Sequence, residues 1–162
     1  MAIDKVKAYF KTFGIEDQIL EFDVSSATVE LAAQAVGCEP AHICKSLSFK
    51  IEERTILILA AGDAKVDNKK YKAYFSSKAK MLAPDEVVER IGHAIGGVCP
   101  FGVNNDVEVY LDDSMKRFEY VYPAAGSSNS AIEMTCEELE KYSSNFVEWV
   151  DVCKGWRPEE QA

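Results

Sequence analysis

The sequence predicts an α+β fold in which helices and strands mix within a single unit, residues 1–162. Some segments have apolar residues at helical spacing. Other segments alternate between apolar and polar residues, or are apolar throughout, as strands are. We find no internal repeat or low-complexity stretch that would divide the chain. A chain of 162 residues with 48% hydrophobic residues can bury the core of an ordinary globular domain.

An amphipathic helix is predicted at the start, because apolar residues recur at helical spacing from Ile3 to Phe13 and Gly14 follows. A short strand is expected at residues 18–22. A second helix should begin near Ser26. Its apolar stripe comprises Val29, Ala32, Ala33 and Val36, and Gly37 follows at the C-cap position.

Two apolar segments, residues 43–51 and 55–61, predict a β-hairpin. Lys45 lies on the apolar side of the first strand. That side also carries Ile43, Leu47, Phe49 and Ile51. An ammonium is tolerated there only at a strand end, beside a carboxylate, or in a pocket that admits an anion. Lys45 is therefore a functional candidate, and a lysine that snorkels from the strand's first residue is the alternative.

A glycine-rich loop follows a helix predicted between Pro84 and Gly92. Gly96 and Gly97 can take positive φ or let a ligand approach the main chain, whereas Pro100 fixes φ and lacks a donor. Exposed amide and carbonyl groups in such a loop can position a water or stabilise an oxyanion. Most Gly-Gly turns merely connect elements, which is the alternative here.

The C-terminal part predicts more strands and one helix. The strands are expected at residues 107–111, 118–122, 131–134 and 146–150. Thr135 and Glu138 form a capping box for the short helix. A polar tail should follow the last strand.

Composition limits the possible functions. The net charge of −9 argues against a protein that coats nucleic acid non-specifically. Five scattered cysteines without a CxxC pair, and only two histidines, predict no structural metal. No apolar run approaches the roughly 18 residues of a membrane span, and the first residues lack the order of a signal peptide. We therefore expect a soluble protein in a reducing cytoplasm.

A local basic cluster lies between residues 65 and 80. It combines Lys65, Lys69, Lys70, Lys72, Lys78 and Lys80 with Tyr71, Tyr74 and Phe75. Basic side chains interleaved with aromatics suit a phosphate backbone and an unstacked base. The alternative is a solvated helix face whose aromatic side chains point inward.

Taken together, the motifs resemble the YbaK/prolyl-tRNA-synthetase-associated domain family. They are Cys44-Lys45-Ser46-Leu47 at the start of a strand, the loop Gly96-Gly97-Val98-Cys99-Pro100-Phe101-Gly102, and the segment from Gly126 to Thr135. This resemblance covers nearly the whole chain. It implies a barrel-like, mostly antiparallel mixed sheet, and an activity that hydrolyses the ester of mischarged aminoacyl-tRNA without a cofactor.

The resemblance also implies roles for particular residues. Lys45 and Gly96 would be catalytic: the lysine engages the anionic terminal nucleotide, and the loop holds the reactive centre through its backbone. Substrate binding would involve Phe22, Val29, Ser46, Gly97, Pro100, Ala124 and Ala131. The expected partners are the acceptor end of tRNA and prolyl-tRNA synthetase. Small residues at positions 124 and 131 favour alanine or another small side chain over cysteine.

Other residues and functions remain open. His42 and His93 are conceivable general bases, and Cys99 is a conceivable nucleophile, although a structural role is the simpler interpretation of each. A rival hypothesis is a non-catalytic module that binds tRNA or a synthetase. A third is an enzyme that acts on a different small ester.

Overall fold

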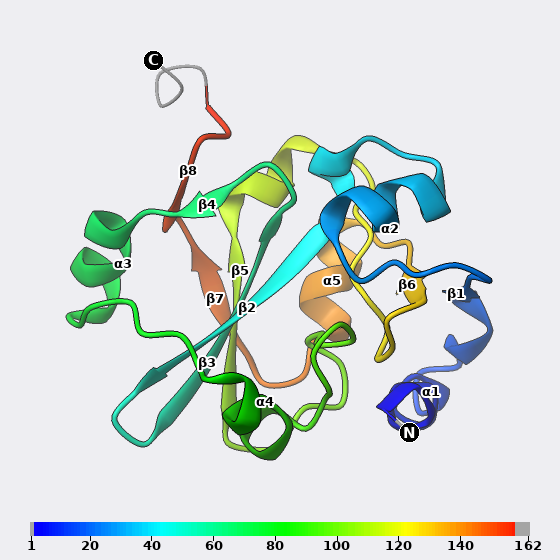
Figure 1. Ribbon diagram of the computed structural model, residues 1–162, viewed down its shortest axis with the longest axis horizontal. Helices are drawn as coiled ribbons and strands as arrows, with labels where there is room; N and C mark the ends of the chain where they lie inside the picture. The colour runs from blue at the N-terminus through cyan, green and yellow to red at the C-terminus, as the bar shows by residue number, and fades with distance from the viewer. Residues whose placement is uncertain (1, 158–162) are drawn as a thin grey trace.

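The computed structural model describes residues 2–157, so Met1 and the end of the predicted polar tail lie outside the described residues (Figure 1). At its centre is a four-stranded sheet in the order β2-β3-β5-β7. These strands are β2 (Cys44–Ile51), β3 (Arg54–Ala61), β5 (Val107–Asp112) and β7 (Phe146–Val150). β3 is antiparallel to β2 and parallel to β5, and β5 is parallel to β7.

The α+β class is confirmed, but the barrel-like closure is wrong. β2 and β7 lie at opposite edges of the sheet and do not pair with each other. Two further antiparallel pairs stand apart from it. They are β1 (Ile19–Glu21) with β6 (Ser130–Ile132), and β4 (Lys65–Val66) with β8 (Cys153–Lys154). The pairing is therefore spread over three separate sheets, and the largest one stays open.

The predicted hairpin is confirmed, with Ile51 opposite Arg54 across a two-residue turn. Glu52 at this turn takes a positive φ of 53°. The apolar run of β3 has a partner strand on either side, and residues 55–61 are all buried. A continuous apolar strand is expected at such a position, because helices or loops cover both of its faces.

Within residues 2–157, five α-helices lie around the sheet (Figure 1). They are α1 (Ala2–Lys11), α2 (Val29–Val36), α3 (Asn68–Phe75), α4 (Pro84–Ile91) and α5 (Cys136–Tyr142). Gly37 and Gly92 end α2 and α4 in the left-handed conformation, with φ of 85° and 100°. Thr135 and Glu138 form the predicted capping box of α5. None of the helices among the described residues is long and apolar enough to cross a membrane.

The strand predicted at residues 118–122 is wrong. A 3₁₀-helix, η3 (Asp113–Arg117), precedes this segment, and two others, η1 (Glu16–Gln18) and η2 (Pro40–His42), lie earlier in the chain. Only isolated bridges form here, from Val121 to Met134 and from Tyr122 to Ile43. Since Val121 and Tyr122 pair with different segments, and both partners lie outside the named strands, this segment extends none of the sheets.

The part of the basic cluster that lies in α3, Asn68–Phe75, has a solvated helix face, while Lys65, Lys78 and Lys80 lie outside this helix. Tyr71 and Phe75 point inward from α3 and are buried, with Tyr71 fully so. Lys69 and Lys72 are exposed on the other side of the helix. The rings of Tyr71 and Phe75 pack in the core, where they cannot stack on a nucleic-acid base, whereas Tyr74 is 40% exposed.

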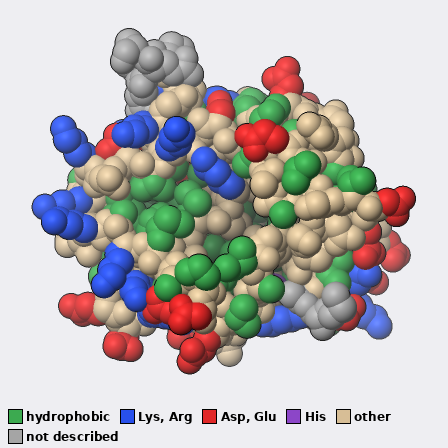
Figure 2. Space-filling model, viewed as in Figure 1, with side chains coloured by type: hydrophobic (Ala, Val, Ile, Leu, Met, Phe, Trp, Pro, Cys, Tyr) green, Lys and Arg blue, Asp and Glu red, His purple; other side chains and the backbone are tan. Residues whose placement is uncertain are grey.

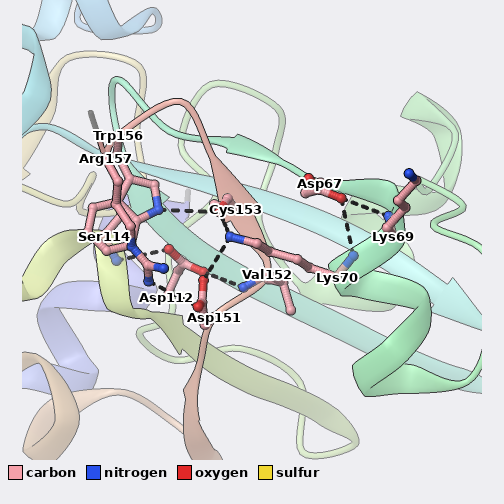
Figure 3. Close-up of polar contacts among 10 residues, drawn as sticks. All are labelled: Asp67, Lys69, Lys70, Asp112, Ser114, Asp151, Val152, Cys153, Trp156 and Arg157. Atoms are coloured by element: carbon pink, nitrogen blue, oxygen red, sulfur yellow. Dashed lines mark hydrogen bonds and ion pairs between the residues drawn. The ribbon is translucent and has the colours of Figure 1, made fainter. Parts of the chain in front are cut away.

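The C-terminal segment is fastened to the sheet by a polar network (Figure 3). Asp112, fully buried at the end of β5, accepts hydrogen bonds from the backbone N–H of Val152 at 3.0 Å and of Ser114 at 2.9 Å. Lys70 donates from α3 to the carbonyl of Cys153 at 2.9 Å. Both carboxylate oxygens of Asp112 therefore have a partner, as a buried charge requires.

Candidate functional site

A cavity of about 320 Å³ lies between α2, the edge of β2, α4 and the Gly96 loop. The face drawn in Figure 2 is hollowed near its middle, with hydrophobic side chains inside and lysine or arginine side chains along part of the rim. Six residues predicted for the site line this cavity: Val29, Lys45, Ser46, Gly96, Ala124 and Ala131. Residues far apart in the sequence thus meet around one hollow.

Lys45 is half-buried in the wall of the cavity. Burial lowers the pKa of its ammonium, and the nearby Lys65 lowers it further, while Cys153, Asp63 and Glu30 act in the opposite direction. Within residues 2–157 the ammonium has no hydrogen bond or ion pair. A half-buried cation without a protein partner is suited to an anionic ligand.

Lys45 and Ser46 reach the same cavity from opposite faces of β2. Successive side chains of a strand alternate between faces, so two neighbours can share a pocket only where it wraps around the strand's edge. β2 is an edge strand of the sheet, and the cavity lies along that edge. The main chain of β2 is therefore part of the wall.

The Gly96 loop forms the opposite side of the cavity. Gly96 has a φ of 94°, and a Cβ there would lie 3.3 Å from Cβ of Ser128 and 3.8 Å from Cβ of Ala27. Glycine thus supplies both the backbone conformation and a close approach to the segment before α2. It also leaves the main chain of the loop open toward the cavity.

Gly97 and Pro100 were expected to bind substrate, but neither residue lines the cavity. A Cβ on Gly97 would lie 2.6 Å from backbone atoms of Gly126 and Ser127. Pro100 is buried, and its carbonyl accepts a hydrogen bond from Ser144 N–H at 2.7 Å. Both residues hold the loop against neighbouring chain segments and so help to fix the position of Gly96.

Phe22 also lies outside the cavity lining. Its N–H donates to the carbonyl of Asn129 at 2.8 Å, and its own carbonyl accepts from Nδ2 of Asn129 at 3.0 Å. These bonds extend the pairing of β1 and β6 by one residue. Phe22 therefore fixes the segment before α2 next to the turn at residues 127–129.

None of the three alternative catalytic candidates lines the cavity. Nδ1 of His42 lies 3.0 Å from the carbonyl of Tyr120, and its ring lies 4.0 Å from that of Phe118. His93 is buried, and its Nε2 donates to the carbonyl of Phe101 at 2.7 Å. Burial raises the pKa of the Cys99 thiol to about 12, so it is a poor nucleophile at neutral pH.

Several residues of the cavity were missed by the sequence reasoning. They are chiefly hydroxyl-bearing and large apolar residues: Ser26, Thr28, Ser48, Ser130, Tyr122, Met81 and Ile95. Met81 and Ile95 are more than half exposed, although both are large and apolar. The alternation of β2 could have pointed to Ser48, which shares a face with Ser46, but no local pattern marks the others. Within residues 2–157, no three His, Cys, Asp or Glu side chains gather as a metal site would require.

The family is decided by comparison with known proteins. A model of the aminoacyl-tRNA editing domain matches residues 24–142. The chain belongs to the aminoacyl-tRNA editing domain family. This match spans α2, β2, the Gly96 loop and α5, and so includes the elements that form the cavity. The resemblance inferred from the motifs is confirmed.

Individual relatives agree with this assignment. The "Uncharacterized protein YwhH" of Bacillus subtilis is 54% identical over 157 residues, which cover 96% of this chain and 99% of that protein. The proline--tRNA ligase of Bacillus velezensis is 33% identical over 90 residues, which cover 55% of this chain but only 16% of the ligase. A solved structure of a "putative trans-editing enzyme for prolyl tRNA synthetase" has a TM-score of 0.80 and 31% identity, and covers 91% of this editing domain and 95% of that chain.

Proposed function

We propose that this editing domain is a cytoplasmic trans-editing deacylase that hydrolyses the aminoacyl ester of mischarged tRNA. The observation that carries the proposal is the half-buried ammonium of Lys45, which has no partner among the described residues and faces a cavity of a few hundred Å³. The family match supports an ester of tRNA as the substrate. The ligase relative supports tRNA-Pro, with prolyl-tRNA synthetase as a partner.

The reaction requires a positioned water and stabilisation of negative charge. The water oxygen adds to the ester carbonyl carbon, and the carbonyl oxygen takes up the negative charge. The C–O bond to the ribose then breaks as the ribose oxygen takes a proton, which releases the amino acid and the free tRNA. The described lining of the cavity has hydroxyl groups and the thiol of Cys44 but contains no His, Asp or Glu side chain to activate one of them as a nucleophile, so we expect positioning to dominate.

Lys45 and Gly96 have different roles in the proposed reaction. In the proposal Lys45 binds a phosphate of the terminal nucleotide, which restores a partner to the ammonium and places the ester inside the cavity. The open main chain at Gly96 lies across from it and orients the water and the ribose. A free ribose hydroxyl next to the ester can assist the water.

The size and lining of the cavity support a small amino acid. Ala32, Ala124 and Ala131 line it without bulky side chains. An apolar pocket discriminates by only about 1–3 kcal/mol for each methylene group, so several small aminoacyl esters would be accepted. Alanine is the first candidate, and serine is the second because Ser46, Ser48 and Ser130 supply hydroxyl groups.

A deacylation assay tests the proposal. tRNA-Pro charged with alanine, cysteine, serine or proline is incubated with the wild type, Lys45→Ala and Lys50→Ala. Lys50 is the matched control, because it lies on the same strand but forms an ion pair with Glu86 at 2.9 Å outside the cavity. We expect the wild type and Lys50→Ala to remove alanine or serine, and Lys45→Ala to lose this activity.

The result also separates the rival functions. Binding of the charged tRNA without turnover would favour the non-catalytic module. Hydrolysis of aminoacyl adenosine in preference to aminoacyl-tRNA would favour a small-ester enzyme. Equal turnover by Lys45→Ala and the wild type would overturn the role of the lysine.

A further inference from the structure

The outer edge of β2 is covered at both ends and open in the middle. At one end Cys44 N–H donates to the carbonyl of Tyr122 at 3.1 Å. At the other end Leu82 N–H donates to the carbonyl of Ser48 at 3.1 Å, and Lys50 N–H donates to the carbonyl of Lys80 at 2.9 Å. The segments that cover the two ends run past the cavity on either side, and Ser46 lies between them.

The register fixes where the main chain of Ser46 points. In an antiparallel pair, every second residue directs both its N–H and its C=O toward the partner strand, and the residues between direct theirs away. Cys44, Ser48 and Lys50 bond outward, away from β3. Ser46 shares their alternation, so its N–H and C=O also point away from β3.

These two groups have no partner among the described residues. No hydrogen bond joins the N–H or C=O of Ser46 to residues 2–157, whereas main-chain bonds flank it on both sides. Ser46 is also part of the cavity wall, together with Lys45 and Gly96. Unpaired edge groups accept a strand-like ligand readily, since a donor and an acceptor are already spaced for one residue.

We propose that the aminoacyl group of the substrate pairs with Ser46 as a one-residue antiparallel strand. The α-ammonium donates to the C=O of Ser46, and the N–H of Ser46 donates to the carbonyl oxygen of the ester. This inference rests on the proposed deacylase function and names how that site holds the reacting group. The carbonyl oxygen carries the negative charge of the tetrahedral intermediate, so the N–H of Ser46 is an oxyanion donor.

The pairing also places the rest of the substrate. Directly opposed residues of an antiparallel pair put their side chains on the same face. The amino-acid side chain would therefore lie on the face of β2 that carries Ser46 and Ser48, while Lys45 extends from the other face. The α-ammonium and the Lys45 ammonium are thus held apart by the strand, which limits their repulsion.

Ser46→Pro tests the donor directly. Proline removes the N–H, and an edge position whose N–H points away from the sheet tolerates it without loss of a ladder bond. Ser46→Ala keeps the N–H and removes only the hydroxyl, so it measures the contribution of the side chain. We expect kcat of Ser46→Pro to fall roughly 10²-fold below that of Ser46→Ala, with a smaller change in KM. Equal kcat values for the two folded variants would overturn the proposal.

A binding measurement keeps the test valid if Ser46→Pro does not fold. The wild type is labelled with ¹⁵N and titrated with adenosine that carries alanine or serine through a non-hydrolysable 3′-amide. We expect the Ser46 amide signal to shift downfield and its proton to exchange more slowly, while the Lys50 amide, already bonded to Lys80, changes little. Saturable binding that leaves the Ser46 amide unchanged would overturn the proposal.

The deacylase activity and the pairing with Ser46 can be tested separately. If the wild type hydrolyses tRNA esters but Ser46→Pro matches Ser46→Ala, the deacylase stands and the pairing with Ser46 is wrong. If the wild type hydrolyses no ester of the panel, the deacylase proposal fails, and the pairing that rests on it falls with it.

Discussion

The network around Asp112 and the edge of β2 at Lys45 and Ser46 are two polar regions built in opposite ways. Asp112 is fully buried, and each of its carboxylate oxygens accepts a backbone hydrogen bond. Lys45 and the main chain of Ser46 have no partner among the described residues. Because an unpaired buried polar group costs free energy, a protein retains one where a ligand completes it. The first region stabilises the fold, and in the proposed function the substrate completes the second.

The largest expected effect on stability comes from Asp112→Ala. The change leaves the N–H groups of Ser114 and Val152 buried without an acceptor, and each such loss costs about 1–3 kcal/mol. We expect urea unfolding to show a loss of about 3 kcal/mol. The control is Asp151→Ala, whose side chain is exposed and forms surface ion pairs worth about 0–1 kcal/mol. A loss for Asp112→Ala no larger than the control would contradict the structural role of the network.

Gly97→Ala should have the next largest effect. Its Cβ would lie 2.6 Å from backbone atoms of Gly126 and Ser127, and backbone can yield only by moving the whole segment. We expect a loss of about 1–3 kcal/mol in thermal or urea unfolding, with a lower deacylation rate because the Gly96 loop shifts. Gly14→Ala gives the cost of backbone strain alone, because Gly14 has a φ of 74° and a Cβ there meets nothing within 4 Å. Unchanged stability and rate for Gly97→Ala would show that the loop position is not critical.

His93 tests whether a missing partner alone signals function. Its Nδ1 is buried without a hydrogen-bond partner, but His93 does not line the cavity. Burial lowers the pKa of His93 in the folded state, so the unfolded state binds the proton first as the pH falls. Stability should therefore decline below about pH 6.5, by at most about 1.4 kcal/mol per pH unit.

The variant His93→Gln removes the titrating imidazole, so it shows how much of the pH dependence of stability comes from His93. We expect the difference in unfolding free energy between the wild type and His93→Gln to change with pH below about 6.5, while deacylation at neutral pH stays measurable. If the pH dependence of stability is the same in both proteins, His93 does not supply it. Loss of all hydrolysis in a folded His93→Gln would give this histidine a part in the chemistry.

The smallest effect is expected for Lys69→Ala combined with Lys72→Ala. Both side chains are exposed on α3, and the neighbouring Tyr71 and Phe75 are buried in the core. The two lysines can only attract phosphates over a distance, so KM for tRNA should rise a few-fold at low salt and converge with the wild type at high salt. A large change in kcat would show that α3 contacts the reacting end.

The sequence revealed the parts of the site that have a local signature. Lys45 is a charged residue on an apolar strand face, and the Gly96 loop combines two glycines with a proline. Alternation along β2 cannot show that this strand lies at an edge, since strand order depends on distant segments. The N–H and C=O of Ser46 are left without a partner because Tyr122 and Leu82 bond to β2 on either side of it, and the positions of these two residues cannot be predicted from local sequence.

Tertiary contacts also explain one wrong prediction and the placement of two motif residues. The pattern at residues 118–122 favours a strand, but Val121 and Tyr122 bond to different partners, so no ladder extends. Pro100 and Gly97 belong to the predicted motif, yet only their contacts with Ser144 and with residues 126–127 reveal that they hold the loop without lining the cavity. Local patterns identify which residues are unusual, and tertiary contacts decide whether those residues touch a ligand.

The most direct test measures stability and deacylation on one variant, Lys45→Met. If the ammonium is kept for substrate, its removal should leave the free energy of unfolding unchanged or higher, because burial already disfavours the charge. Hydrolysis of mischarged tRNA-Pro should fall roughly 10²-fold in the same preparation. A variant that is clearly less stable than the wild type and still hydrolyses the ester at the wild-type rate would contradict the account, because Lys45 would then serve the fold.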